Sequence, residues 1–281
     1  MPAWDEAAVT AAAKRLRLSL DPRRRRHGQG NRLGAGPGAS LEFHDHRAYV
    51  AGDDLRHLDW GVYARTDQLV LRRHRVEVSP ILEILLDVSL SMDAHPGRFA
   101  HCCALAALLA TLAEQDGGRP RLWLLGAGAR RLGGEDPWRA GLRQAAAAGA
   151  AGLDQRHLAC QPGSDRIVIS DGMCPTPGRQ LIDQLGRGAG RITAIHCLVA
   201  AERDPAVAGP VHLQDAEHGG RDSILDEAAV ADYRARLLRH QGSWSAALAG
   251  RGAGLILLAL EDGLDRHLRQ LVDAGIVEVR V

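Results

Sequence analysis

A continuous apolar run that ends in an aspartate constrains the fold of this chain more than any other stretch. Residues 81–86 read ILEILL, and Glu83 alone interrupts the leucines and isoleucines. Strands that are covered on both faces of a parallel sheet have this pattern. Asp87, Ser89 and Ser91 follow where the strand is expected to end. The run therefore predicts a central parallel strand with polar side chains at its carboxyl end, the edge where α/β sheets bind ligands.

A second strand ends in the same way. Residues 167–172 read IVISDG, so a short β-branched strand ends at Asp171 and a glycine follows. Two aspartates so far apart in sequence can meet only if their strands lie close together in one sheet. Carboxylates and hydroxyls are hard oxygen donors, the ligands that Mg²⁺ and Ca²⁺ prefer. We therefore predict a cation site at this sheet edge, with the ligands Asp87, Ser89, Ser91 and Asp171.

The rest of the chain alternates between strand and helix patterns. Strands are expected at residues 70–78, 81–86, 121–125, 167–171, 192–199, 211–216 and 255–260, and helices at residues 4–20, 99–114, 138–150, 180–185, 226–248 and 264–274. Residues 126–136 suit a hairpin or a loop, and Gly219 and Gly220 suit a turn. Repeated strand–helix alternation indicates parallel strands with helices on both faces. The predicted fold class is therefore α/β, with a doubly wound, mostly parallel, Rossmann-like sheet.

Composition argues against several classes of function. The formal net charge is +1, which gives no general case for binding nucleic acid or a membrane surface. The N-terminus lacks the basic and apolar regions of a signal peptide, and the most apolar long window, residues 100–113, falls short of the roughly 18 residues that a membrane helix needs. The five cysteines show no C-x-x-C spacing, so neither disulfides nor zinc sites are expected. We therefore expect a soluble, cytoplasmic protein without a membrane span.

Residues 1–40 are predicted to form an N-terminal segment of their own. A short amphipathic helix is expected to end at Asp21 and Pro22, and four arginines, Arg23–Arg26, follow it before a glycine-rich stretch. The arginines suit either a solvated loop or a patch for phosphate or an acidic partner. We favour the solvated loop, because the run is short and no aromatic residues are interleaved with it.

Residues 41–66 are dense in polar and aromatic side chains that pair in fixed geometry. A turn at Gly52 is expected to present two carboxylates to arginine forks. The members of the predicted network are Arg47, Tyr49, Asp53, Asp54, Arg56, Asp59, Trp60 and Arg65. The network would either pin this arm through internal salt bridges or form a docking surface for a partner. We favour the architectural role, since arginine–carboxylate networks are usually structural.

Two motifs carry a resemblance to known families. The pattern R-x-Y-x-x-G-D-D-x-R-x-x-D-W, from Arg47 to Trp60, resembles the signature of a bacterial family called domain of unknown function fifty-eight. Asp-x-Ser-x-Ser after one buried strand, with Ser-Asp-Gly after another, resembles the metal-ion-dependent adhesion site of von Willebrand factor A domains. The resemblance implies a von Willebrand A-like domain over residues 81–281, preceded by a signature arm over residues 41–80.

The resemblance also implies roles for the site residues. Ser89 and Ser91 would ligate Mg²⁺ through their hydroxyl oxygens, and Asp87 and Asp171 would act mainly through waters. One coordination position would stay open for a carboxylate of a partner. Adhesion sites also use a threonine between the two aspartates, but residues 148–154 (AGAAGLD) contain neither threonine nor serine. The predicted site therefore lacks the threonine ligand.

Three functions follow from these patterns. The leading hypothesis is a non-enzymatic binding module, and the family resemblance implies an adaptor or co-chaperone beside a MoxR-type AAA+ ATPase. A metal-dependent hydrolase is the first alternative, although Ser89 stands where aspartyl-phosphate phosphatases need a second aspartate and no G-x-S-x-G motif is present. A metal-independent assembly component that uses the segment from Arg47 to Trp60 is the second alternative.

Overall fold

The structure is a computed structural model that describes residues 4–19, 42–51, 53–75, 81–133, 138–148, 152–154, 158–215, 219–251 and 253–280. The chain divides into two compact units. Unit 1 comprises Met1–Ser19 and Pro80–Val281, and unit 2 comprises Leu20–Ser79. The first helix therefore belongs to unit 1, the unit that contains the α/β sheet.

A six-stranded sheet forms the centre of unit 1. Its strands, in spatial order, are β11 (Leu255–Ala259), β8 (Arg191–Leu198), β7 (Asp165–Ser170), β4 (Leu82–Asp87), β5 (Arg121–Leu125) and β6 (Ala129–Leu132). Neighbouring strands run parallel except β5 and β6, which form an antiparallel pair with Leu125 opposite Ala129. The mostly parallel α/β sheet that the sequence predicts is therefore confirmed.

The order of the strands places a topological switch point between β4 and β7. From β4 the chain continues to β5 and β6 on one side, and it then returns to β7, β8 and β11 on the other side of β4. β4 and β7 pair in parallel, with Leu86 opposite Ile169. Their carboxyl ends therefore meet at one edge of the sheet, where open α/β sheets bind ligands.

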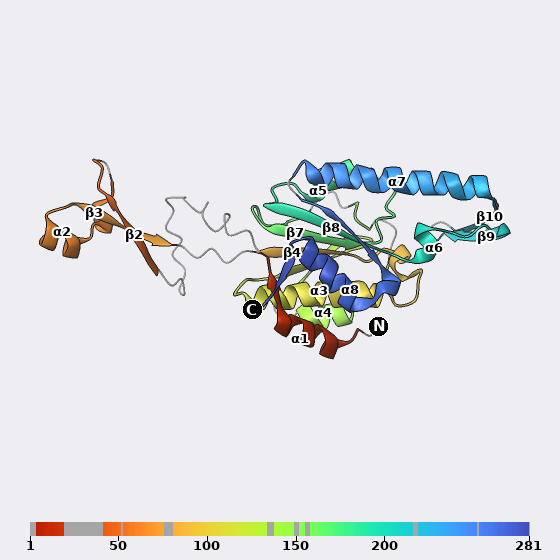
Figure 1. The fold of residues 1–281 in the computed structure, drawn as a ribbon, viewed down its shortest axis with the longest axis horizontal. Helices are drawn as coiled ribbons and strands as arrows, with labels where there is room; N and C mark the ends of the chain where they lie inside the picture. Colours follow the sequence, from red (N-terminus) through yellow and green to blue (C-terminus); the bar gives the residue numbers. More distant parts are fainter. Residues whose placement is uncertain are drawn as a thin grey trace. The chain divides into compact units, whose positions relative to one another are not determined.

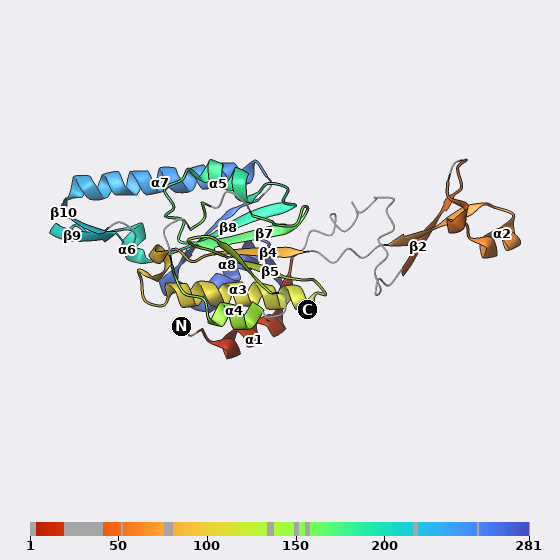
Figure 2. The same ribbon diagram turned by 180° about the vertical axis from the view of Figure 1, so that it is seen from behind.

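Helices cover both faces of the sheet (Figure 1). One face carries α1 (Glu6–Arg15), α3 (Arg98–Gln115), α4 (Trp138–Arg143) and α8 (Gly263–Asp273), and the other carries α5 (Gly178–Leu185) and α7 (Glu227–Ala249). The alanines and leucines of α3 are buried nearly all round, as expected of a helix inside a core. The view from behind shows the same two layers of helices (Figure 2).

Apolar side chains fill the space between the sheet and the layer of α5 and α7. Leu85 and Val168 of the sheet lie in one cluster with Leu181 of α5 and with Trp244 and Leu248 of α7, all of them buried. This cluster anchors the C-terminal half of α7 to the sheet.

Strands from the two ends of unit 1 pair with each other. β1 (Leu16–Leu18) runs antiparallel to β12 (Val277–Val279). The backbone N–H of Leu18 donates to Asp116 Oδ2 at 3.0 Å, which ties this pair to the end of α3. The helix predicted over residues 4–20 is too long, since α1 ends at Arg15 and β1 begins at Leu16. Neither strand is predicted, because three residues are too few to show the two-residue periodicity of a strand.

A hairpin follows the carboxyl end of β8. After the short helix α6 (Ala200–Arg203), β9 (Gly209–Asp215) pairs antiparallel with β10 (Gly219–Leu225). The prediction of a turn at the two glycines is wrong, because they begin β10. The helix predicted over residues 138–150 is also too long, since α4 ends at Arg143.

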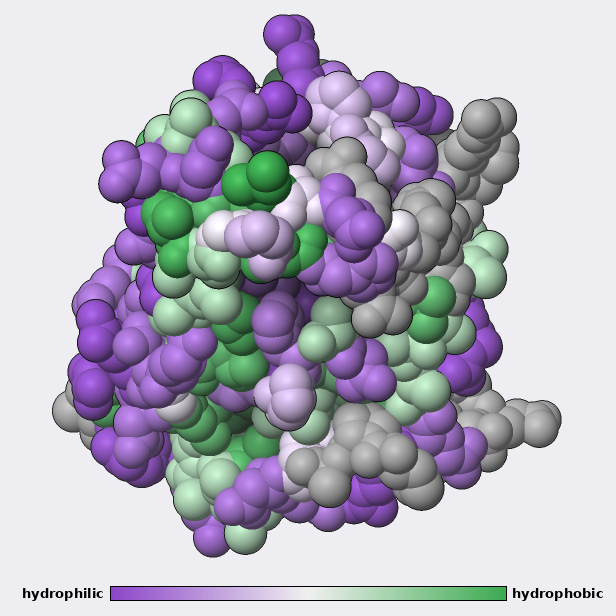
Figure 3. Space-filling model, turned by 90° about the vertical axis from the view of Figure 1, so that its right-hand side faces the viewer, coloured by the Kyte–Doolittle hydropathy of each residue, from purple (hydrophilic) through white to green (hydrophobic). Residues whose placement is uncertain are grey.

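Exposed apolar side chains occur along the segment that contains this hairpin. Val207 is 55% exposed and Ile224 is 62% exposed, and Leu213 is 36% exposed. Figure 3 views the molecule from the side where the hairpin lies and shows apolar surface beside hydrophilic surface.

Unit 2 is the smaller of the two units, and its described part buries few apolar side chains. Its described part contains β2 (Glu42–Ala48), the 3-10 helix η2 (Leu55–His57), α2 (Trp60–Thr66) and β3 (Val70–Arg75), and β2 pairs antiparallel with β3. Leu58 and Leu71 are buried, whereas α2 has no buried residue. Small units with so little burial have little stability of their own.

Candidate functional site

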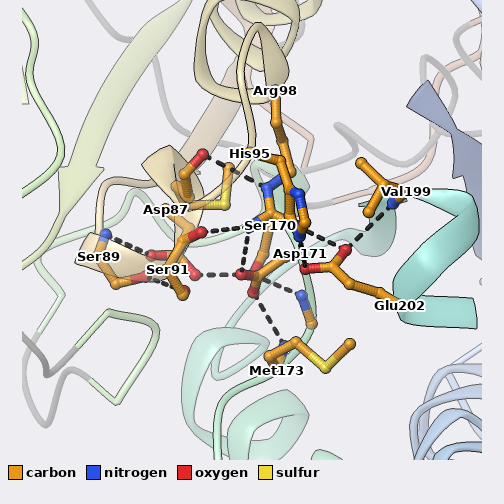
Figure 4. Close-up of polar contacts among 12 residues, drawn as sticks. Asp87, Ser89, Ser91, His95, Arg98, Ser170, Asp171, Met173, Val199 and Glu202 are labelled. Atoms are coloured by element: carbon orange, nitrogen blue, oxygen red, sulfur yellow. Dashed lines mark hydrogen bonds and ion pairs between the residues drawn. The ribbon is translucent and has the colours of Figure 1, made fainter. Parts of the chain in front are cut away.

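The two predicted aspartates converge at the switch point. Asp87 is the last residue of β4, and Asp171 directly follows the last residue of β7. Both residues are 2% exposed. Figure 4 shows their carboxylates in one cluster of polar side chains. The fold therefore brings together the two strand ends that the sequence singles out.

Ser170 links the two carboxylates. Its hydroxyl donates to Asp87 Oδ2 at 2.7 Å and lies 3.5 Å from Asp171 Oδ1. The backbone N–H of Gly172 donates to Ser170 Oγ at 2.9 Å, so this hydroxyl is fixed in place. The second oxygen of Asp87, Oδ1, accepts the backbone N–H of Ser89 at 2.9 Å.

The two predicted serine ligands also lie in the cluster. Ser89 is the N-cap residue of the 3-10 helix η3 (Leu90–Asp93), and Ser91 lies in its first turn. Their hydroxyl oxygens are 3.1 Å apart. Two hydroxyls at this separation, next to a buried carboxylate, form a compact set of oxygen donors.

The charge of Asp87 is poorly compensated. Burial, and then the negative charge of Asp171, raise the pKa of Asp87 from its ordinary value of 3.8 to about 6, although hydrogen bonds from Ser170 and Ser89 oppose this rise. Burial disfavours the charged form of a carboxyl, and a like charge nearby disfavours it further. A cation between the two carboxylates would relieve both effects.

A fully buried arginine lies beside this cluster. Arg98, in the first turn of α3, donates through Nη1 to both carboxylate oxygens of Glu202 at 2.7 Å. Its Nη2 donates to the backbone carbonyl of Ser91 and lies 3.6 Å from Asp171 Oδ2. That carboxylate oxygen is buried and has no hydrogen-bond partner.

Several other groups hold Glu202, which lies in α6. The backbone N–H of Val199 donates to Glu202 Oε2 at 3.1 Å, and His95 Nε2 lies 3.1 Å from Oε1. The hydroxyl of Tyr233, on α7, donates to the backbone carbonyl of Glu202. The polar cluster at the sheet edge is thus connected to α6 and to α7.

Two glycines let the backbone approach the site closely. Gly172 has a φ of 71°, and a Cβ there would lie 2.3 Å from Nδ1 of His196. A Cβ on Gly152 would lie 3.1 Å from Asp87 Oδ1. The loop that lacks the expected threonine therefore reaches the site through a glycine, and the next residue, Leu153, is buried in the core.

The signature residues of unit 2 make local contacts. Asp53 Oδ2 accepts the backbone N–H of Val50 at 2.9 Å, and Asp59 caps α2 by accepting from two backbone N–H groups. Asp54 forms an ion pair with Arg56 at 2.7 Å.

The other predicted members of the network are placed by the backbone and by ring contacts. Arg47 lies in β2 opposite Leu71, and the N–H of Tyr49 donates to the carbonyl of Leu69 at 2.9 Å. Trp60 packs edge-on against Tyr63, and Arg65 lies in the last turn of α2. Residues Arg23–Arg26 lie outside the described residues.

The donor set at the sheet edge fits a hard divalent cation. All of its groups are oxygen donors, and Asp171 Oδ2 is a buried oxygen without a hydrogen bond. Among the described residues, no group of three or more His, Cys, Asp or Glu could hold a metal ion. The predicted cation site is of a different kind, because it combines two carboxylates with two serine hydroxyls.

Sequence reasoning missed Arg98 and Glu202. Glu202 follows the carboxyl end of β8, the strand next to β7, so its position after a predicted strand is a signal that could have identified it. Arg98 gives no comparable signal, because an arginine in the first turn of a helix is usually exposed.

Comparison with known proteins matches the chain to a protein family and to mycobacterial relatives. A family described as "Protein of unknown function DUF58" matches residues 45–242. Uncharacterized proteins of Mycobacterium tuberculosis and Mycobacterium bovis are 27% identical to the chain over 280 residues, which cover 90% of this chain and 86% of each relative.

Among solved structures, the chain is similar to a conserved hypothetical protein BatB from Bacteroides thetaiotaomicron. The two share 14% identity with a TM-score of 0.41, and the match covers 70% of this chain and 98% of that one. No helix in the described ranges has the length and apolar character that crossing a membrane requires.

Proposed function

Because the chain belongs to the DUF58 family of proteins of unknown function, we propose its function from the site: a non-enzymatic, Mg²⁺-assisted protein-binding module. In this proposal unit 1 works as a von Willebrand A-like domain. It binds an acidic side chain of a partner at the switch point between β4 and β7.

The observation that carries the proposal is the set of oxygen donors at this edge. Asp87, Ser89, Ser91 and Asp171 lie in one cluster, and a buried oxygen of Asp171 lacks a hydrogen bond. A bound Mg²⁺ would be a hard cation that can accept a carboxylate of the partner as a ligand. The serine hydroxyls would hold the cation, and the aspartates would orient its water ligands.

The same contacts argue against catalysis. Ser170 is fully buried, and its proton is directed to Asp87, so its oxygen is not poised to attack a substrate. Burial raises the pKa of Cys174 above its ordinary value, which disfavours the reactive thiolate. A binding role therefore explains the cluster with fewer assumptions than a hydrolase does.

The proposed partner is a MoxR-type AAA+ ATPase, for which the chain would act as an adaptor or co-chaperone. This part of the proposal comes from the family resemblance and not from the geometry. The test is a pull-down with a MoxR-type ATPase of the same organism, in Mg²⁺ and in chelator. Wild type and Asp93→Ala, at an exposed aspartate of η3, should recover the ATPase in Mg²⁺, whereas Asp87→Ala should not.

Two results would contradict parts of this proposal. Equal recovery of the ATPase with and without Mg²⁺ would exclude docking through the cation. Hydrolysis of a generic phosphate ester that is abolished in Asp87→Asn would favour the hydrolase instead.

Exposed side chains of unit 2 favour a second candidate, a metal-independent assembly component. Trp60 is 60% exposed and Leu55 is 55% exposed, and aromatic residues of this kind often anchor protein interfaces. In this case Trp60→Ala would abolish partner binding, and chelator would have no effect.

A further inference from the structure

Arg98 is a buried cation that lies between two carboxylates and contacts them unequally. Its side chain is fully buried, so its charge must be compensated by neighbouring groups. Nη1 lies 2.7 Å from both oxygens of Glu202, which satisfies that side of the guanidinium. On the other side, Nη2 donates to the carbonyl of Ser91.

The contact with Asp171 is too long for a hydrogen bond. Nη2 lies 3.6 Å from Asp171 Oδ2, whereas N–H···O hydrogen bonds span about 2.7–3.2 Å. Asp171 Oδ2 therefore stays buried without a hydrogen bond, although a guanidinium is within reach. A small rotation of the arginine toward Asp171 would satisfy this oxygen and would place a positive charge where a metal ion is expected to act.

We propose that Glu202 is a positioning residue that keeps the site open to a divalent cation by holding Arg98 away from Asp171. When Glu202 releases Arg98, the guanidinium pairs with Asp171 and excludes the cation. Asp171 thus has two possible counter-ions, the internal Arg98 and an external metal ion, and each excludes the other. This inference rests on the proposed function, because it concerns the same cation site.

The elements that hold Glu202 suggest what would control the exchange. Glu202 lies in α6, directly before the segment that leads to the β9–β10 hairpin, and Tyr233 binds its backbone carbonyl from α7. A partner that displaces α6 would therefore loosen Glu202 and lower cation affinity. Coupling between two binding events is reciprocal, so the cation would disfavour that displacement equally.

The experiment is calorimetric titration of the full chain with Mg²⁺ alone. Glu202→Gln keeps the shape of the side chain but weakens its hold on Arg98, and it should reduce Mg²⁺ affinity about tenfold, as loss of a residue that supports a metal site typically does. The double variant Arg98→Met/Glu202→Gln removes the competing cation and should restore affinity at least to the wild-type level. Glu261→Gln is the matched control, because Glu261 binds the backbone N–H of Ala200 at the start of the same helix.

The double variant tests whether Arg98 is the competitor. Because it has the net charge of the wild type, the crystal structure described next separates competition by Arg98 from a change in net charge. If the double variant binds Mg²⁺ as weakly as Glu202→Gln, Arg98 is not the competitor, and the inference is overturned. The inference is also overturned if Glu261→Gln weakens Mg²⁺ binding as much as Glu202→Gln does.

A metal-free crystal structure of Glu202→Gln tests the inference independently of Mg²⁺ binding. The distance between Arg98 Nη2 and Asp171 Oδ2 should shorten from 3.6 Å to about 2.9 Å. An unchanged distance would overturn the inference. If wild type does not bind Mg²⁺ but the arginine still moves in the variant, the proposed function fails, whereas the positioning role of Glu202 stands.

Discussion

Replacing Asp87 by asparagine is expected to stabilise the metal-free protein at neutral pH. Burial and the charge of Asp171 raise the pKa of Asp87 from 3.8 to about 6. The folded protein binds the proton of Asp87 more tightly than the unfolded chain does, so protonation of Asp87 favours the folded state. This contribution to the unfolding free energy is complete below pH 3.8 and is lost as the pH rises through about 6. Ionised Asp87 therefore costs about 3 kcal/mol of unfolding free energy above about pH 7.

Asparagine removes the charge and keeps the shape of the side chain. Its oxygen can still accept the N–H of Ser89, and its amide can donate to Ser170 Oγ in place of the bond that this hydroxyl now donates. Allowing about 1 kcal/mol for a weaker hydrogen bond, we expect a net gain of about 2 kcal/mol above about pH 7. Below about pH 4 the gain should turn into a loss of up to about 1 kcal/mol, because Asp87 is then protonated in the folded protein and only the weaker hydrogen bond remains.

Urea unfolding in the presence of chelator measures this effect. Wild type, Asp87→Asn and the control Asp93→Asn are compared at about pH 4 and above about pH 7. Asp93 is an exposed residue of the same 3-10 helix, so its substitution should change stability little at either pH. The reasoning is refuted if Asp87→Asn is less stable than wild type at neutral pH, or if its difference from wild type does not depend on pH.

Three further predictions concern other parts of the chain. Gly172→Ala should destabilise unit 1 by about 3 kcal/mol in thermal unfolding, because φ is 71° and the added Cβ would clash with His196; full stability would contradict this packing. Asp59→Ala should cost unit 2 about 1 kcal/mol through loss of the N-cap of α2, measured by hydrogen exchange, while Mg²⁺ binding to unit 1 should not change. Trp60→Ala should change stability by less than about 0.5 kcal/mol, since this side chain is 60% exposed, and a larger loss would reveal a buried role.

The elements that the sequence predicts best are those with long, unambiguous patterns. β4 and α3 are found within a residue or two of their expected bounds, because an apolar strand between breakers and an alanine- and leucine-rich helix allow few alternatives. The convergence of Asp87 and Asp171 also follows from their positions at strand ends, since parallel neighbours align these ends at one edge.

The elements that were missed depend on contacts between distant residues. β1 and β12 exist because they pair with each other, and neither carries a local signal. The same is true of Arg98, which is buried because Glu202, far along the chain, compensates its charge. The glycines that begin β10 have low strand propensity, and pairing with β9 overrides it.

The pairing of β1 with β12 has a consequence for synthesis on the ribosome. Arg280 Nε donates to the carbonyl of Leu16 at 2.7 Å across 264 positions of sequence. β1, the first strand of unit 1, therefore lacks its partner until the ribosome has translated β12. Until then the backbone groups of β1 that pair with β12 remain available to other binders, and nascent chains stalled before β12 should be preferred clients of ribosome-associated chaperones.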